Sequence, residues 1–144
     1  MSNSLYNAAL VMLARREHSQ KELCSKLSFK YSFSPDDLRE LLERLRNEGL
    51  QCDERFADSY TRSRIRKGFG PERIKMELNE KGISSTIVRS VMDSYEGEWR
   101  EIAYREWRKK YNTRPADINE QVKQSRFLRY RGFRSCDIRE VMQT

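Results

Sequence analysis

Two groups of arginine residues are the part of this sequence whose type and spacing could support binding chemistry. The first group lies on one arc of a helix predicted to start near Asp53, at about 100° per residue, and comprises Arg55, Arg62 and Arg66. The second group stands among Phe127, Tyr130 and Phe133 and comprises Arg126, Arg129, Arg131 and Arg134. Guanidinium groups bind carboxylate and phosphate oxygens through paired hydrogen bonds, and aromatic rings stack on bases. Both groups are therefore candidate contacts for an anionic partner.

The basic charge is concentrated toward the C-terminus, and this separates the two arginine groups. The chain has 144 residues and a formal charge of +7. The excess of basic over acidic side chains is +1 in residues 1–50, +1 in residues 51–96 and +5 in residues 97–144. A concentrated positive field attracts polyanions, so phosphate contact is expected for the second group and localised acidic side chains for the first. A basic face that meets only solvent is the alternative for each group.

The sequence contains no set of residues that would point to catalysis. The only histidine, His18, stands beside a predicted helix start, where a role in the cap or the turn is favoured. The three cysteines are too far apart for a zinc site or a disulfide framework, so we predict reduced thiols at Cys24, Cys52 and Cys136. No P-loop, dinucleotide-binding fingerprint, HExxH or GxSxG motif occurs. We therefore predict a binding protein, not an enzyme, with no metal and no cofactor.

The composition favours an all-α fold built from small units. Hydrophobic residues make up 37% of the chain and charged residues 35%, which suffices for narrow apolar stripes on helices rather than for a thick core. Sustained alternation of β-branched residues, which strands would show, is missing from the sequence. The sequence has no run of about 18 apolar residues and no signal-peptide pattern. We expect a cytoplasmic protein without a membrane span, and a monomer.

Start and stop signals divide residues 5–49 into three predicted helices. Ser19 and Glu22 have the spacing of a capping box, in which each side chain accepts a hydrogen bond from the other residue's backbone N–H. Ser34 followed by Pro35 is an equally clear helix start, because proline is favoured at the first helical position.

The stretch from Gly49 to Ile83 reads as a helix, a glycine-proline turn and a second helix. Asp53 is the predicted N-cap of the first helix, and Pro71 takes the first position of the second. The predicted buried arc of the first helix holds Phe56, Tyr60, Ser63 and Lys67. We expect this unit to be held together by Phe56, Tyr60, Ile74 and Leu78.

An offset of 50 residues aligns the chain with itself and indicates an internal repeat. The offset places Leu41 on Val91 and then on Val141, and it also places Leu78 on Leu128. We therefore predict an elongated, curved array of three tandem three-helix repeats, with boundaries at residues 1–50, 51–96 and 97–144. In the third and least regular copy, Ser135 is predicted to cap the last helix.

Helix-turn-helix DNA binding is an alternative interpretation of these short helices and tight turns. The last helix of the second repeat, however, offers only Arg89 as a basic residue and ends in acidic residues. It would make a poor recognition helix. The residues alone therefore indicate a basic adaptor for an extended partner, with direct nucleic-acid contact as an auxiliary role.

Three motifs resemble those of a known family. They are LARREHSxxELxxKL from Leu13, GLxxxxRFAxxYxxxR from Gly49 and GxGPxRIxxEL from Gly68. These motifs are similar to those of the RecX proteins, bacterial regulators of the RecA recombinase. Phe69 stands where a tyrosine is common in that family.

The resemblance implies a negative modulator of RecA. Proteins of this family bind RecA filaments on single-stranded DNA and dampen strand exchange, ATP hydrolysis and LexA cleavage. An extended basic repeat protein would fit the groove of such a helical filament and could touch the DNA weakly. On this interpretation Arg55, Arg62 and Arg66 meet RecA, and the second arginine group meets nucleic acid. An independent DNA-binding protein is the main alternative, and a scaffold for some other acidic partner is the third interpretation.

Overall fold

The structure, a computed structural model, describes residues 2–143 and consists there of α-helices, one short 3-10 helix and no strand. Module 1 comprises α1 (Ser2–Arg15), α2 (Gln20–Lys30) and α3 (Pro35–Asn47). Module 2 comprises α4 (Asp53–Arg66), α5 (Pro71–Glu80) and α6 (Ser85–Ser94). Module 3 follows the 3-10 helix Glu96–Glu98 and comprises α7 (Trp99–Lys110), α8 (Ile118–Tyr130) and α9 (Ser135–Gln143). The predicted all-α fold of three-helix repeats is confirmed.

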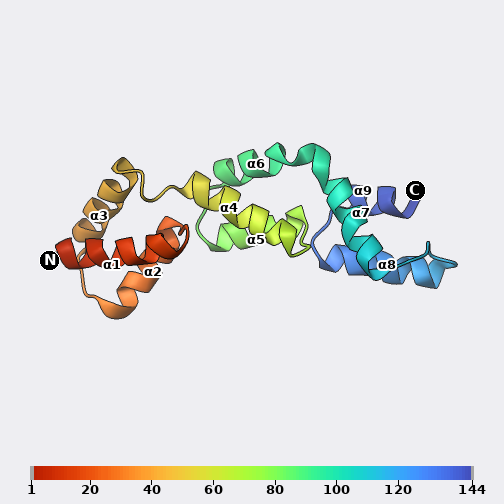
Figure 1. The fold of residues 1–144 in the computed structure, drawn as a ribbon, viewed down its shortest axis with the longest axis horizontal. Helices are drawn as coiled ribbons and strands as arrows, with labels where there is room; N and C mark the ends of the chain where they lie inside the picture. The colour runs from red at the N-terminus through yellow and green to blue at the C-terminus, as the bar shows by residue number, and fades with distance from the viewer. Residues whose placement is uncertain (1, 144) are drawn as a thin grey trace.

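The three modules follow one another along the long axis of the molecule (Figure 1). Helices α1 to α3 lie at one end with the N-terminus, and α7 to α9 lie at the other end with the C-terminus. Each module therefore meets only its neighbours in the sequence, as in other repeat arrays.

Equivalent positions of the repeat are buried alike. Leu78 and Leu128, which the 50-residue offset superimposes, are both 0% exposed. The offset also relates the buried residues Leu41, Val91 and Val141. The internal repeat in the sequence is thus a repeat of core positions.

Side chains at the helix starts match the predicted signals in module 1 and depart from them at two other places. Ser19 forms the predicted capping box with Glu22 at the start of α2. Asp53, however, is the first residue of α4, and its carboxylate accepts a hydrogen bond at 3.1 Å from the backbone N–H of Gln20. It therefore caps a helix of the neighbouring module. Ser135 is likewise the first residue of α9 and not the residue before it.

The buried side of α4 is rotated relative to the predicted arc. Phe56 is buried and Tyr60 is half-buried, but Ser63 is only half-buried and Lys67 is exposed. Thr61, which is 0% exposed, takes the inner position instead. The reason is that α4 packs against both α5 and α6, so its buried arc is turned toward the side of Thr61.

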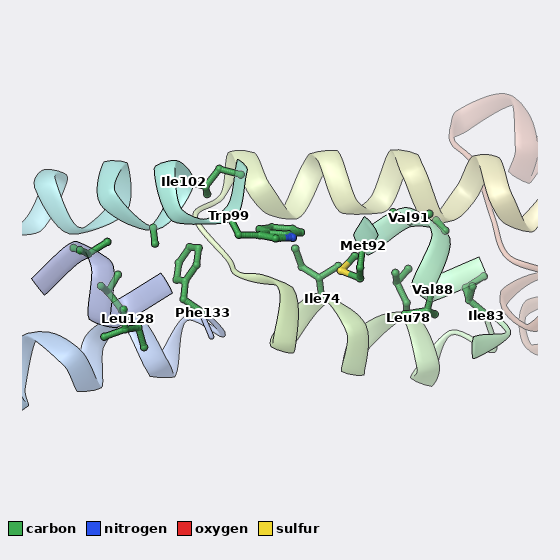
Figure 2. Packing of buried hydrophobic residues seen from close by; sticks show 14 of the residues in the cluster. Ile74, Leu78, Ile83, Val88, Val91, Met92, Trp99, Ile102, Leu128 and Phe133 are labelled. Carbon is green, nitrogen blue, oxygen red and sulfur yellow. The ribbon is translucent and has the colours of Figure 1, made fainter. Parts of the chain in front are cut away.

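Modules 2 and 3 share one continuous hydrophobic core. Trp99 at the start of α7 lies between Ile74 of α5 and Phe133, and Figure 2 shows the row of side chains that results. The two turns beside this row also pair through their backbones. The N–H of Gly70 donates to the carbonyl of Arg131 at 2.8 Å, and a Cβ on Gly70 would stand 2.6 Å from the carbonyl carbon of Gly132. This approach requires glycine, and it fixes one module against the other.

Module 1 has a core of its own and meets module 2 through polar contacts. The buried side-chain amide of Gln51 donates to the carbonyl of His18 at 3.1 Å and to the carboxylate of Asp53 at 2.9 Å. The ammonium of Lys81 forms an ion pair with the carboxylate of Glu22, at 3.3 Å. The described residues thus form two apolar cores joined by a hydrogen-bonded boundary.

Candidate protein and nucleic-acid interface

The three arginines predicted to contact a protein partner are exposed but differ in what they already bind. Arg55 donates to the carboxylate of Glu17 at 2.7 Å, and so ties α4 to module 1. Arg62 pairs with Asp58 one turn earlier on the same helix. Arg66, at the end of α4, has no partner among residues 2–143. Arg66 is therefore the member of this group whose charge is free to meet a partner.

The four arginines predicted to contact nucleic acid divide into two exposed residues and two that are engaged. Arg126 and Arg129 are exposed on α8 and make no ion pair within the described chain. Arg131 donates to the carbonyl of Lys67 at 3.1 Å, across the boundary between modules 2 and 3. Arg134 binds Asp137 at 2.7 Å. Only the first two present uncommitted guanidinium groups.

Arg134 is held by a second acid as well. Its guanidinium also meets Glu96 at 3.0 Å, so it bridges the segment before α7 to the start of α9. The hydrogen bond to Asp137 raises the pKa of Arg134 above its ordinary value, burial acts against this, and the bond to Glu96 adds to the rise. Arg134 therefore has a structural role in module 3, because its guanidinium is shared between two carboxylates.

The aromatic residues near these arginines are also of two kinds. Phe133 is 2% exposed and belongs to the core, and Phe127 is half-buried beside Tyr111. The guanidinium of Arg131 lies 5.3 Å from the ring centroid of Phe127, and so occupies that face of the ring. Tyr130 is 80% exposed, on the same helix as Arg126 and Arg129. Tyr130 is the ring in this group that could stack on a base.

A network around Glu77 was not foreseen from the sequence. Glu77 on α5 accepts two hydrogen bonds from Arg64, at 2.8 and 2.9 Å, one from Tyr60 at 2.9 Å and one from Arg73 at 3.3 Å. Both guanidinium groups also lie over the ring of Phe69. The one signal in the sequence that could have indicated this network is a concentration of opposite charges on neighbouring helices.

The network shifts the acidity of its members. Burial and the hydrogen bond to Glu77 raise the pKa of Tyr60 to about 12. Burial by itself would raise the pKa of Glu77, but the hydrogen bonds from Arg64, Tyr60 and Arg73 outweigh it and lower that pKa. Glu77 is thus a fully paired carboxylate, and the network fixes the turn between α4 and α5.

His18 lies in a structural setting. Its side chain is almost entirely buried, and its Nε2 lies 2.9 Å from the ammonium of Lys26. Because an ammonium only donates, Nε2 is the acceptor and Nδ1–H donates to the carbonyl of Arg16 at 3.0 Å. Burial lowers the pKa of His18, the charges of Arg16 and Lys26 add to this, and the bond to the Arg16 carbonyl opposes it. The ring is therefore neutral.

The described part of the chain contains no grouping of three or more His, Cys, Asp or Glu side chains that could hold a metal ion. The cysteines within it are free thiols, with Cys136 exposed and Cys24 and Cys52 partly buried. None of the helices described is long and apolar enough to cross a membrane.

These features define an all-helical repeat protein whose exposed basic side chains are presented on a row of three-helix modules. The second and third modules match the family models for the second and third three-helix domains of RecX, over residues 53–92 and 96–142. The chain belongs to the RecX family.

Relatives agree with this assignment over most of the chain. The chain is 41% identical to the regulatory protein RecX of Legionella pneumophila over 129 residues, which cover 89% of this chain and 85% of the relative. It is 36% identical to the regulatory protein RecX of Chromohalobacter salexigens, over 93% of this chain and 88% of the relative. The crystal structure of RecX from Lactobacillus salivarius superimposes with a TM-score of 0.86 at 28% identity, over 99% of this chain and 94% of that one.

Proposed function

We propose that this protein is a negative modulator of RecA that binds the RecA nucleoprotein filament and inhibits its recombinase, ATPase and coprotease activities. The observation that carries the proposal is the similarity to regulatory RecX proteins over about nine-tenths of the chain. The place of action is the cytoplasm, where it takes part in DNA repair, recombination and the SOS response, and the acting species is a monomer without a cofactor.

The shape of the molecule supports binding along a filament groove. The three modules are arranged in a row, so one molecule can contact successive subunits of a helical polymer (Figure 1). The shared core and the paired turns hold modules 2 and 3 in a fixed orientation. A fixed orientation reduces the entropy that is lost on binding.

The inhibition is proposed to act through binding and not through chemistry. His18, the only histidine, is buried and neutral and holds the loop between α1 and α2. Glu77 and Arg134 are both engaged in internal ion pairs, with Arg64 and Asp137. Among the seven arginines predicted as contacts, Arg66, Arg126 and Arg129 are uncommitted, and guanidinium groups suit contacts to carboxylates and phosphates.

Independent DNA binding is the second candidate, and the surface of α8 favours it. Arg126 and Arg129 are exposed there beside the exposed ring of Tyr130. Phosphate contacts and ring stacking are together typical of proteins that bind single strands without sequence preference. In the proposal above this surface adds a weak DNA contact to filament binding. In the alternative it is the whole function.

A titration of the protein into RecA assembled on single-stranded DNA tests the proposal. We expect ATP hydrolysis, LexA cleavage and strand exchange to fall together and to reach a plateau, at protein concentrations that leave naked DNA unoccupied. Salt titrations of binding to naked DNA and to the filament give the comparison. Tight binding to naked DNA with all three RecA activities unchanged would reject filament inhibition in favour of the alternative.

A further inference from the structure

Module 1 carries a groove that the arginine groups do not involve. The groove lies on α1 and α2 with the residues that follow them, has a volume of about 810 Å³, and is lined mainly by apolar atoms. Phe29, near the end of α2, is 93% exposed, and Val11 on α1 is 59% exposed. Ligand sites typically have volumes of about 300–1,000 Å³, and apolar side chains that lie together on an exposed surface are typical of binding surfaces, as Phe29 and Val11 do in this groove.

The charges that line this groove are all of one sign. Its charged lining residues are four basic side chains and no acid, namely Arg15, Arg16, Lys26 and Lys30. Yet module 1 as a whole is nearly neutral, with an excess of +1 over residues 1–50. The fold therefore separates the charges. Glu17 is turned to Arg55 on α4, and Glu22 is shared by Arg16 and Lys81.

One of the basic groups is held in place before any ligand arrives. The ammonium of Lys26 is 2.9 Å from Nε2 of the buried His18, whose ring is fixed in turn by the Arg16 carbonyl. Arg15 and Lys30 have no acidic partner in the described part of the chain. The groove thus offers one oriented and two free cationic groups around an apolar floor.

We propose that this groove is a docking site for an acidic peptide segment that carries large apolar side chains. Its apolar side chains would cover Phe29 and Val11, and its carboxylates would meet Lys26, Lys30 and Arg15. The lining also includes two rings, Phe29 and Tyr31, on which a base could stack. The floor itself is aliphatic, formed by Ala8, Val11 and Met12, and these side chains have no polar group for a base edge, which favours a peptide. The proposal concerns a second binding surface and does not rest on RecA inhibition.

Selection from random dodecapeptides displayed on phage, against the full-length protein, tests the inference without a known partner. We expect the selected peptides to be enriched in Asp and Glu together with Leu, Phe or Trp. A fluorescein-labelled peptide from the selection is then titrated with the wild type, with Phe29→Ser and with Lys30→Glu. Each substitution should weaken binding about tenfold, as for a residue central to an interface.

Two matched variants control for general effects of polarity and charge. Ile118→Ser removes a side chain that is 76% exposed on α8, and Arg46→Glu reverses an exposed charge on α3 of the same module. Both should bind the peptide as the wild type does. Circular dichroism checks that all four variants fold, which is expected because each changed side chain points to solvent.

Three results would overturn the inference. The first is a selection that yields neutral or basic peptides. The second is a loss of peptide affinity in the two control variants as large as the loss in Phe29→Ser and Lys30→Glu. The third is labelled oligothymidine that binds more tightly than any selected peptide and loses affinity with Phe29→Ser and Lys30→Glu. That last result would assign the groove to single-stranded nucleic acid.

Discussion

At the scale of residues, two fully buried leucines of the shared core allow a direct test of what burial contributes to stability. Leu78 and Leu128 occupy equivalent repeat positions and are both 0% exposed, one in each of the modules that share a core. Removing three carbons from such a side chain loses their transfer free energy and leaves a cavity.

We expect Leu78→Ala to lower the free energy of unfolding by about 2–5 kcal/mol. Met76, two residues earlier on α5 and 55% exposed, gives the control, and Met76→Ala should change stability by less than about 0.5 kcal/mol. Urea unfolding followed by circular dichroism measures both. An unchanged midpoint for Leu78→Ala would mean that α5 turns a different face to the core.

His18 should make stability depend on pH near neutrality. The pKa of His18 in the folded protein lies below the ordinary value of 6.5, which applies to the unfolded chain. Between these two values the unfolded chain binds more protons, so stability is highest above pH 6.5 and falls as the pH drops through this window. The groups that face the ring are Arg16, Lys26 and Glu22. Carboxylates titrate at lower pH, about 4.

His18→Gln tests this expectation, because glutamine offers a donor and an acceptor but no titrating ring. The free energy of unfolding of the wild type should decrease on going from pH 7.5 to about pH 5.5, and that of the variant should stay level over the same range. Buffered urea melts at a series of pH values provide the measurement. The same slope in both proteins would show that other groups set the pH dependence.

At the scale of elements, the turn after α8 packs closely against the start of α5, where modules 2 and 3 meet. Gly132 has a φ of 99°, and a Cβ there would lie 2.5 Å from Cβ of Arg73 and 2.8 Å from its backbone nitrogen. Gly49 has a φ of 72° with no atom within 4 Å of the position of a Cβ. The two glycines therefore differ in packing but share a left-handed backbone.

This pair separates backbone strain from steric exclusion. Gly49→Ala should cost about 1–2 kcal/mol of stability, which is the penalty of the left-handed conformation. Gly132→Ala should cost clearly more, because modules 2 and 3 would also have to move apart. Thermal and urea unfolding of the two variants decide the point. Equal losses would mean that the turns tolerate separation.

The elements themselves could be predicted from the sequence because their signals are local. Ser19 with Glu22, Ser34 with Pro35, and the apolar spacing of Leu41 and Leu45 lie within one or two helical turns. The 50-residue offset then supplied the three-helix repeat. These signals need no knowledge of which helices come together.

The sequence could not predict which polar side chains are shared between modules. Asp53 has the sequence signature of an N-cap for its own helix, yet it caps α2, because the fold brings Gln20 to it from 33 residues away. Arg131 and Arg134 look like surface arginines until the structure shows Lys67 and Asp137 beside them. Of the predicted interface, the spacing of the arginines was therefore visible in the sequence and their availability was not.

At the scale of the molecule, residues 2–143 form two apolar cores of unequal size joined by a polar boundary. Module 1 has its own core, whereas modules 2 and 3 share one. Hydrogen bonds and ion pairs, such as those of Gln51 and Lys81, contribute only about 1 kcal/mol each to such a boundary, so they couple its two sides less strongly than a shared apolar core would. Module 1 should therefore unfold separately from the rest.

Both tryptophans, Trp99 and Trp107, lie in the shared core and report on it alone. We expect Leu27→Ala, in the core of module 1, to shift the loss of helical circular dichroism toward lower urea and to leave the tryptophan fluorescence transition in place. Coincident transitions that shift together would identify the molecule as one cooperative unit.

The two arginine groups should act differently in the assembled complex, because they have different surroundings along the array. Arg62 and Arg66 lie on module 2, in a region whose excess charge is only +1, so we expect localised acidic side chains of the RecA filament there. Arg126 and Arg129 lie on module 3, where the excess is +5 and Tyr130 is exposed, so we expect phosphates there. Arg131 and Arg134 are left unchanged because each also holds another segment, through Lys67 and Glu96. The contact of Arg62 to Asp58 is an exposed pair within α4, which contributes little.

Charge reversal at Arg62 and Arg66 should raise the protein concentration required to inhibit the RecA ATPase at least about tenfold. Binding of the same variant to naked DNA should be nearly unchanged. Arg126→Gln with Arg129→Gln should instead lower DNA affinity and reduce the salt slope on single strands by about 0.7 for each phosphate that the variant no longer binds. Both reactions are measured for both double variants after circular dichroism has shown that they fold. Equal losses in the two assays would mean one diffuse electrostatic surface, since a uniform positive field responds to the number of charges removed and not to their position.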